Sequence, residues 1–151
     1  MKSMKLLPLL LVSVLLVGCK ENAELPCQKT GFTDKPVCPV SFFQALGNTN
    51  YDHRVVRISG FLRTKQVNGS PKSFLYFSKE QADIQNTSGA LEVGSFAQGV
   101  KPVRLTAYQK VLSTSDNAYV EIIGEISYLP TTGMDVPAAK VSDLVGVRVV
   151  P

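Results

Sequence analysis

The segment RVVRISGFLR, residues 54–63, alternates between apolar and polar side chains. In an extended strand this alternation separates the two kinds onto opposite faces, with Val56, Ile58 and Leu62 on one and Arg57, Ser59 and Arg63 on the other. Gly60 falls among the apolar positions, and a glycine inside a long strand is typical of a bend or bulge, as where a barrel turns a corner. The segment therefore predicts a long, bent strand with one buried face.

The sequence on both sides predicts further strands and several helices. Val67-Asn68-Gly69-Ser70 is a turn that would fold the next strand back as a hairpin. The expected strands after the first one are 73–77, 90–93, 118–128 and 141–149, and Gly124 interrupts the long one as Gly60 does the first. Two Ser-x-x-Gln boxes, at 41–44 and 78–81, predict short helices, and Gly47 would end the first of them. A longer helix is expected from Pro102 to about Leu112.

The resulting order is two strands, a short strand, a helix and two more strands. It is similar to the five-stranded oligonucleotide/oligosaccharide-binding barrel, or OB-fold, with its helix between strands three and four and here a short N-terminal helix before it. The chain also resembles small periplasmic OB-like lipoproteins through VRISGFL (56–62) and YVEIIGE (119–125). The expected fold is mainly β and OB-fold-like, and a small β-sandwich is the alternative.

The N-terminal residues carry an export pattern. Lys2 and Lys5 precede an apolar stretch, Leu6–Val17, that is too short to span a bilayer. It ends in Leu16-Val17-Gly18-Cys19, which resembles the lipobox of bacterial lipoproteins. The resemblance implies cleavage before Cys19, a diacylglycerol on its thiol and an N-acyl chain such as palmitate on its amine, and together these hold a protein firmly to a membrane. Because Lys20 replaces the Asp that causes inner-membrane retention in many such proteins, we expect the periplasmic face of the outer membrane.

Two further cysteines, Cys27 and Cys38, would lie in an oxidising compartment and are expected to form a disulfide. Closing the irregular segment Gln28–Val37 in this way would stabilise the fold by roughly 2 to 3 kcal/mol. The expected organisation is a signal peptide at 1–18, a lipidated tether and disulfide loop at 19–38, and the OB-fold-like domain at 39–151.

Charge and motifs argue against several function classes. The formal net charge of +4 includes Lys2 and Lys5 of the leader, and the other charges form no run of like sign, so no nucleic-acid partner is expected. The only histidine, His53, follows Asp52 and more often caps a turn in this setting than performs acid–base catalysis. No nucleophile motif or zinc ligand set occurs, and the aspartates available for calcium are isolated: Asp83, Asp116, Asp135 and Asp143. We therefore expect no enzyme activity, no metal, and no cofactor other than the lipid on Cys19.

Glu121 and Glu125 would share one strand face, about 13 Å apart at 3.3 Å per residue, which is too far for a pair of glycosidase carboxylates. In an OB barrel the first and fourth strands are neighbours, so Arg57 or Arg63 would lie across from these carboxylates. Cross-strand ion pairs are the preferred interpretation, and a ligand site is the alternative.

If the barrel face binds a polymer by stacking and polar contacts, the candidate residues are Phe61, Arg63, Tyr76 and Tyr119. The leading hypothesis is a membrane-anchored, non-catalytic module that binds an envelope protein or glycan. The alternative is an inhibitor or immunity-type lipoprotein that protects against a wall-degrading enzyme or toxin. An enzyme acting on glycan is a third class, which would need a pocket that unites His53 with two carboxylates.

Overall fold

The structure is a computed structural model that describes residues 26–84, 86–130 and 136–151. The signal peptide, Cys19 and Lys20 lie outside the described residues, so the predictions made on them stay predictions. Within the described ranges, no helix is both long enough and apolar enough to cross a membrane.

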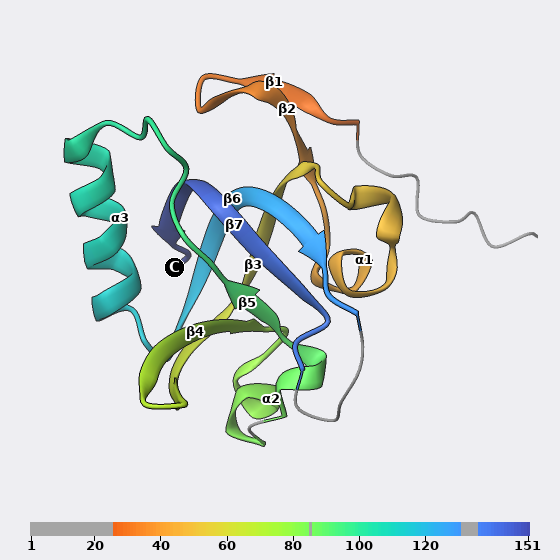
Figure 1. Cartoon of the computed structure of the whole chain (residues 1–151), viewed down its shortest axis with the longest axis vertical. Coiled ribbons are helices and arrows are strands. Elements are labelled where there is room, and N and C mark those ends of the chain that lie inside the picture. The colour runs from red at the N-terminus through yellow and green to blue at the C-terminus, as the bar shows by residue number, and fades with distance from the viewer. Residues whose placement is uncertain (1–25, 85, 131–135) are drawn as a thin grey trace, which may run out of the picture.

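Seven strands and several short helices follow one another along the chain (Figure 1). The strands are β1 (Gln28–Thr30), β2 (Thr33–Pro39), β3 (Val55–Val67), β4 (Ser70–Tyr76), β5 (Leu91–Val93), β6 (Ala118–Tyr128) and β7 (Ala139–Val149). The α-helices are α1 (Phe42–Gly47), α2 (Lys79–Asp83) and α3 (Pro102–Thr114), with 3-10 turns η1 (Thr49–Tyr51) and η2 (Thr87–Gly89).

The five strands β3, β4, β5, β7 and β6 are hydrogen-bonded in that order, and β6 pairs back with β3 to close the barrel. All of these pairs are antiparallel except β5 with β7, which run parallel. Since α3 lies between the third and fourth barrel strands in the sequence, the order is that of an OB-fold. The predicted OB-fold-like barrel is confirmed, and the β-sandwich alternative is wrong because the sheet closes on itself.

Side chains fill the barrel. The predicted inward positions of β3, namely Val56, Ile58 and Leu62, are fully buried. They meet inward side chains from the other barrel strands, such as Leu75, Leu91, Val120, Ile122, Ile126, Val141 and Leu144. The barrel interior is therefore a packed hydrophobic core.

The hairpin between β3 and β4 turns through Asn68 and Gly69, which both have positive φ (52° and 78°). Two consecutive residues in this conformation give the tight two-residue turn that matches the twist of paired strands. The two strands therefore extend closer to the turn than expected. β3 continues to Val67 and β4 begins at Ser70, and these two residues are paired.

The N-terminal segment differs from the prediction. The segment expected to be irregular, Gln28–Val37, forms the β1–β2 hairpin, which rises above the barrel in Figure 1. β2 then pairs in parallel with β3 through Val37↔Val55, Cys38↔Val56 and Pro39↔Arg57. Parallel pairing joins segments far apart in the chain, so no local pattern signals it. The predicted disulfide between Cys27 and Cys38 is confirmed, and it ties the start of β1 to the end of β2.

Both predicted capping boxes begin helices. In α1, the Ser41 Oγ accepts from the Gln44 backbone N–H at 3.2 Å, and the Gln44 side chain accepts from the Ser41 N–H at 2.9 Å. In α2, the Ser78 side chain accepts from the Gln81 N–H at 3.4 Å. Figure 1 shows α1 and α3 on opposite sides of the barrel, with α2 below it.

Tyr128, at the end of β6, holds the segment that follows α1 against the barrel by two hydrogen bonds. Its phenol donates to the Asn48 carbonyl at 2.6 Å, and its backbone N–H donates to Asp52 Oδ1 at 3.2 Å. Burial, together with the nearby Asp52 carboxylate, raises the pKa of Tyr128 to about 12. The neutral phenol is therefore the form that the folded state favours.

Replacing Tyr128 by Phe is expected to cost about 1 kcal/mol of unfolding free energy at pH 8, because one partly buried hydrogen bond is lost. A tyrosine in the unfolded chain has a pKa of about 10, so the stabilisation by Tyr128 is complete below that pH and is lost as the pH rises toward 12. Urea denaturation of wild type and Tyr128→Phe at pH 8 and pH 11 measures this. A difference in stability that stays constant between the two pH values would contradict the prediction.

Candidate functional site

The four residues predicted to bind a ligand lie together on the outer face of the barrel. Phe61 of β3 is in register with Tyr76 of β4 and with Tyr119 of β6. However, Phe61 and Tyr76 are almost completely buried, because Phe74, Ala82 of α2 and Ala90 pack with them in a second small core. A ligand could stack on these two rings only by displacing α2.

Arg63 holds α2 in this position. Its Nη2 lies 2.6 Å from Asp83 Oδ1, and its guanidinium carbon is 5.9 Å from the centre of the Phe61 ring. Hydrogen bonds from Lys79 and Arg63 lower the pKa of Asp83. Tyr119 contacts Phe61 edge-on at 5.3 Å and keeps an exposed surface. Of the four residues, only Tyr119 presents an aromatic ring to solvent, and its ligand role stays a prediction.

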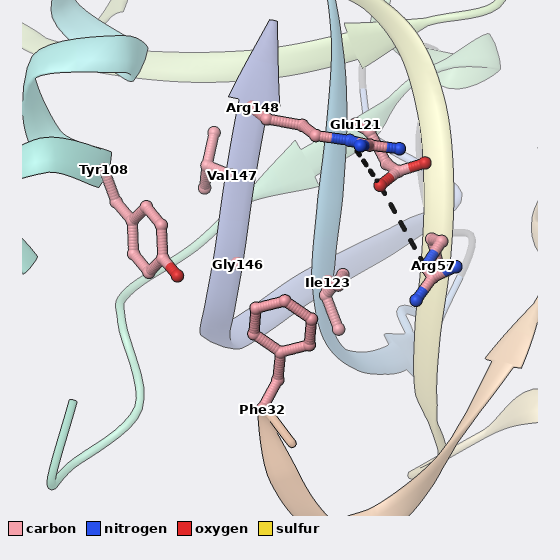
Figure 2. Close-up of a pocket in the computed structure, with 8 residues that line it drawn as sticks. All are labelled: Phe32, Arg57, Tyr108, Glu121, Ile123, Gly146, Val147 and Arg148. Carbon is pink, nitrogen blue, oxygen red and sulfur yellow. Dashed lines mark ion pairs between the residues drawn. The ribbon is translucent and has the colours of Figure 1, made fainter. Parts of the chain in front are cut away.

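A separate pocket of about 290 Å³ opens on the outer face of β3, β6 and β7 (Figure 2). Its walls are the tip of the β1–β2 hairpin on one side and α3 on the other. The lining residues are Phe32, Arg57, Tyr108, Glu121, Ile123, Gly146, Val147 and Arg148.

Two aromatic side chains form the opposing walls. Phe32 stands at the tip of the hairpin, between the paired residues Thr30 and Thr33, and its side chain is about half exposed. Tyr108 projects from α3 and stacks on Phe96, with ring centres 6.1 Å apart and planes 13° apart. Figure 2 shows Phe32 reaching toward Ile123, with Tyr108 on the far side of β7. The two rings therefore line the pocket from opposite sides of β7.

A charged row crosses the pocket from β7 to β3. Arg148 Nε lies 2.9 Å from Glu121 Oε1, and Arg57 Nε lies 4.0 Å from the same oxygen. The Arg57 Nε is shielded from solvent and has no hydrogen-bond partner among the described residues. Of the cross-strand ion pairs expected between Arg57 or Arg63 and Glu121 or Glu125, the structure shows Arg57–Glu121. Arg63 does not pair with Glu121 or Glu125, because it turns to Asp83 instead.

Gly146 lines the pocket and has no side chain that would fill it. It pairs with Ile123, and a Cβ at this position would stand 3.2 Å from Ile123 Cδ1. Any larger side chain at 146 would therefore fill space that the pocket now leaves open.

His53 lies in a different cluster, at the start of β3. Its ring nitrogens are 3.6 Å from Asp52 Oδ2 and 3.5 Å from Glu125 Oε1, and its side chain is 74% exposed. The histidine thus meets two carboxylates, but at a water-exposed position, with Lys35 Nζ already 2.7 Å from Glu125 Oε2. No group of three or more His, Cys, Asp or Glu side chains in residues 26–84, 86–130 and 136–151 is placed to hold a metal ion.

Lys35 links the hairpin to the barrel through Glu125, and its hydrogen bond lowers the pKa of that carboxyl. Replacing Lys35 by Gln is expected to raise the pKa of Glu125 toward the ordinary value of about 4.5. In the wild type, the Lys35–Glu125 contact contributes its full stabilisation above about pH 4.5, the ordinary pKa of a glutamate. The contribution is lost as the pH falls through the lowered pKa of Glu125. Carboxyl-carbon NMR titration measures the change.

Lys79→Gln is the matched control for this titration. It should raise the pKa of Asp83, to which Lys79 donates at 2.8 Å, and leave that of Glu125 unchanged. An unaltered Glu125 titration in Lys35→Gln would show that the hairpin is not held to β6 by this pair.

Sequence reasoning singled out Arg57 and Glu121 but missed Phe32, Tyr108 and Arg148 as members of a site. The missed residues come from the hairpin tip, α3 and β7, and only the tertiary fold brings these elements together. Phe32 did carry one local signal, since it follows Gly31 at a turn, where an exposed aromatic ring is unusual.

Among known proteins, no family model and no curated sequence matches this chain. Similar solved structures include a putative aspartyl-tRNA synthetase from Leishmania major Friedlin, with 10% identity and a TM-score of 0.45 over 83% of this chain and 23% of that one. Asparaginyl-tRNA synthetase from Entamoeba histolytica gives 12% identity and a TM-score of 0.44 over 76% of this chain and 23% of its own. The OBody AM3L09, solved bound to hen egg-white lysozyme, gives 13% identity and a TM-score of 0.43 over 67% and 85%.

This chain spans about a quarter of the length of each synthetase, so neither their activity nor their substrates are carried over to it. These similarities concern the fold alone, and the strand order and closure described above carry the assignment independently. The chain is an OB-fold-like barrel with an added N-terminal hairpin.

Proposed function

We propose that this protein is a membrane-anchored, non-catalytic module that binds an envelope glycan in the pocket between the β1–β2 hairpin and α3. The observation that carries the proposal is the combination of two aromatic walls with the Arg57–Glu121–Arg148 row across the floor. Small-ligand sites are typically concave and apolar, with a few well-placed polar groups that orient the ligand.

The polar row suits hydroxyl groups better than a simple anion. A sugar hydroxyl both donates and accepts, so it can donate a hydrogen bond to a carboxylate and accept one from a neighbouring guanidinium. Both arginine contacts go to Glu121 Oε1, and the Arg57 and Arg148 side chains are 38% and 70% exposed. Guanidinium N–H groups other than the shielded Arg57 Nε would therefore donate to the ligand. An anionic ligand would instead lie against the negative charge of Glu121.

The aromatic walls suit the apolar face of a sugar ring. Phe32 lies beside Ile123 on one side of β7, and Tyr108 lies beside Val147 on the other. The volume of about 290 Å³ is near the lower end of small-ligand pockets, which begin at about 300 Å³. The pocket would therefore hold one sugar unit of a polymer and leave its neighbours on the open surface.

The sequence supplies the remaining part of the proposal. The lipobox-like Leu16-Val17-Gly18-Cys19 and Lys20 predict an anchor in the outer membrane, from which the protein would face the cell-wall glycan. Mass spectrometry of the native protein tests this part, with an acylated residue 19 and no leader as the expected result.

Titration of the lipidated protein, in detergent, with N,N′-diacetylchitobiose, the uncharged disaccharide of N-acetylglucosamine, tests the binding site. We expect chemical-shift changes at the pocket, and at least a tenfold weaker affinity in Phe32→Ala and in Glu121→Gln. Phe43→Ala removes an exposed phenylalanine outside the pocket and should bind as wild type does. Equal affinity in all four proteins, or no binding at all, would overturn the glycan proposal.

Two further experiments address catalysis and the inhibitor alternative. A non-catalytic module should return the disaccharide unchanged after long incubation. A photoreactive residue at position 32 in living cells should then crosslink to glycan. Crosslinking to one secreted enzyme or toxin instead would favour the inhibitor function.

A further inference from the structure

Two large aromatic side chains are exposed side by side on α1 and at the end of β4. Phe43 is 62% exposed and Phe77 is 50% exposed, and their ring centres are 4.5 Å apart. Beneath them Phe42 is buried, with its ring 6.2 Å from that of Phe77, so the exposed pair rests on a fixed base. We call Phe43 and Phe77 the phenylalanine patch. Contiguous apolar surface that stays exposed often marks a place where an apolar partner binds.

Few charged residues lie near the patch in the sequence, and the nearest acidic one is Glu80, three residues after Phe77. The segment from Pro39 to Tyr51, which contains α1, carries no charged residue. Beside Phe77, the Lys79 ammonium is paired with Asp83 at 2.8 Å. A surface with exposed rings and few charges fits the interfacial layer of a bilayer rich in zwitterionic lipid, because little charge has to approach the acyl chains.

The disulfide brings the patch close to the expected anchor. Cys19 precedes Cys27 by eight residues, which is at most about 29 Å of extended chain. Cys27 is bonded to Cys38, with the two Cα atoms 4.0 Å apart. Phe43 then follows Cys38 by five residues, at most about 18 Å further. The acyl chains and the patch are therefore tied to the same point of the fold, and the tether is too short to carry the domain far from the membrane.

We propose that the phenylalanine patch lies against the bilayer that holds the lipid of Cys19, with both rings inserted at its interface. This inference rests on the anchor in the proposed function, but not on the glycan pocket. Since α1 and α3 lie on opposite sides of the barrel in Figure 1, the contact would turn the α3 side, with its pocket, away from the membrane.

Tryptophan fluorescence tests the inference directly, because the chain contains no tryptophan and each variant reports one position. The protein used is the full lipidated chain, reconstituted into vesicles of phosphatidylethanolamine and phosphatidylglycerol (3:1) with brominated acyl chains. Phe43→Trp places the probe in the patch. Val103→Trp is the matched control, since Val103 is 83% exposed on α3 at the opposite side.

We expect the emission of Trp at position 43 to shift to shorter wavelength and to lose at least half its intensity in brominated vesicles. Trp at position 103 should behave as it does in buffer. Flotation of the same samples distinguishes a missing lipid anchor from a missing contact between the patch and the bilayer. Protein that floats with the vesicles while position 43 is quenched no more than position 103 overturns the membrane contact and leaves the anchor intact. Protein that does not float overturns the anchor and this inference with it.

Discussion

Replacing Gly124 by alanine is expected to lower the unfolding free energy by about 3 kcal/mol, because the added methyl group has no space. A Cβ at this position would stand 2.6 Å from the Ser142 carbonyl oxygen and 2.8 Å from Leu144 Cδ2. The oxygen belongs to β7, which pairs with β6 here at an irregularity between Ile123 and Glu125. Because the obstacle is backbone, relief requires the two strands to separate, and a side-chain rotation would not suffice.

Urea denaturation of the purified protein measures this effect, with Gly47→Ala as the matched control. Gly47 ends α1, and a Cβ there would meet nothing within 4 Å, so the control should unfold as wild type does. Gly60→Ala should behave like Gly124→Ala, since its Cβ would lie 2.7 Å from the Tyr76 carbonyl oxygen. A Gly124→Ala protein within 0.5 kcal/mol of wild type would show that β6 and β7 separate there at little cost.

These glycines also show why the barrel was predictable from the sequence. Gly60 and Gly124 each interrupt a long alternating strand, and both interruptions are positions where another strand passes too close for a side chain. Alternation, the Asn68-Gly69 turn and the serine capping boxes are local signals, and each formed the element it predicted. The order of these elements was then enough to indicate an OB-fold.

The candidate site was predictable only in part, because it depends on contacts between distant segments. An ion pair between Arg57 or Arg63 and Glu121 or Glu125 was expected from the barrel order, and of these Arg57–Glu121 forms. Phe61 and Tyr76 were candidates to stack against a ligand on the barrel face, but α2 covers them. No local pattern indicates that a five-residue helix will fold over a strand. The parallel pairing of β2 with β3, which carries Phe32 to the pocket, likewise has no local signature.

Removing the disulfide, as Cys27→Ala/Cys38→Ala, is expected to cost about 3 kcal/mol on the loop-entropy estimate for a loop of this size. Cys38 is buried in the main core and pairs with Val56, so β2 would remain against β3. β1, however, would lose its covalent link and keep only its short pairing with β2.

The hairpin should therefore loosen at β1 before the barrel unfolds, and hydrogen exchange would show this as faster exchange at Lys29 than at Arg57. Wild-type protein treated with dithiothreitol should reproduce the variant in both stability and exchange. Because Phe32 stands at the tip of this hairpin, glycan affinity should also fall in the variant while the barrel is still folded. A variant that loses less than 1 kcal/mol and keeps the exchange rates of wild type would mean that the Lys35–Glu125 contact and strand pairing hold the hairpin without the disulfide.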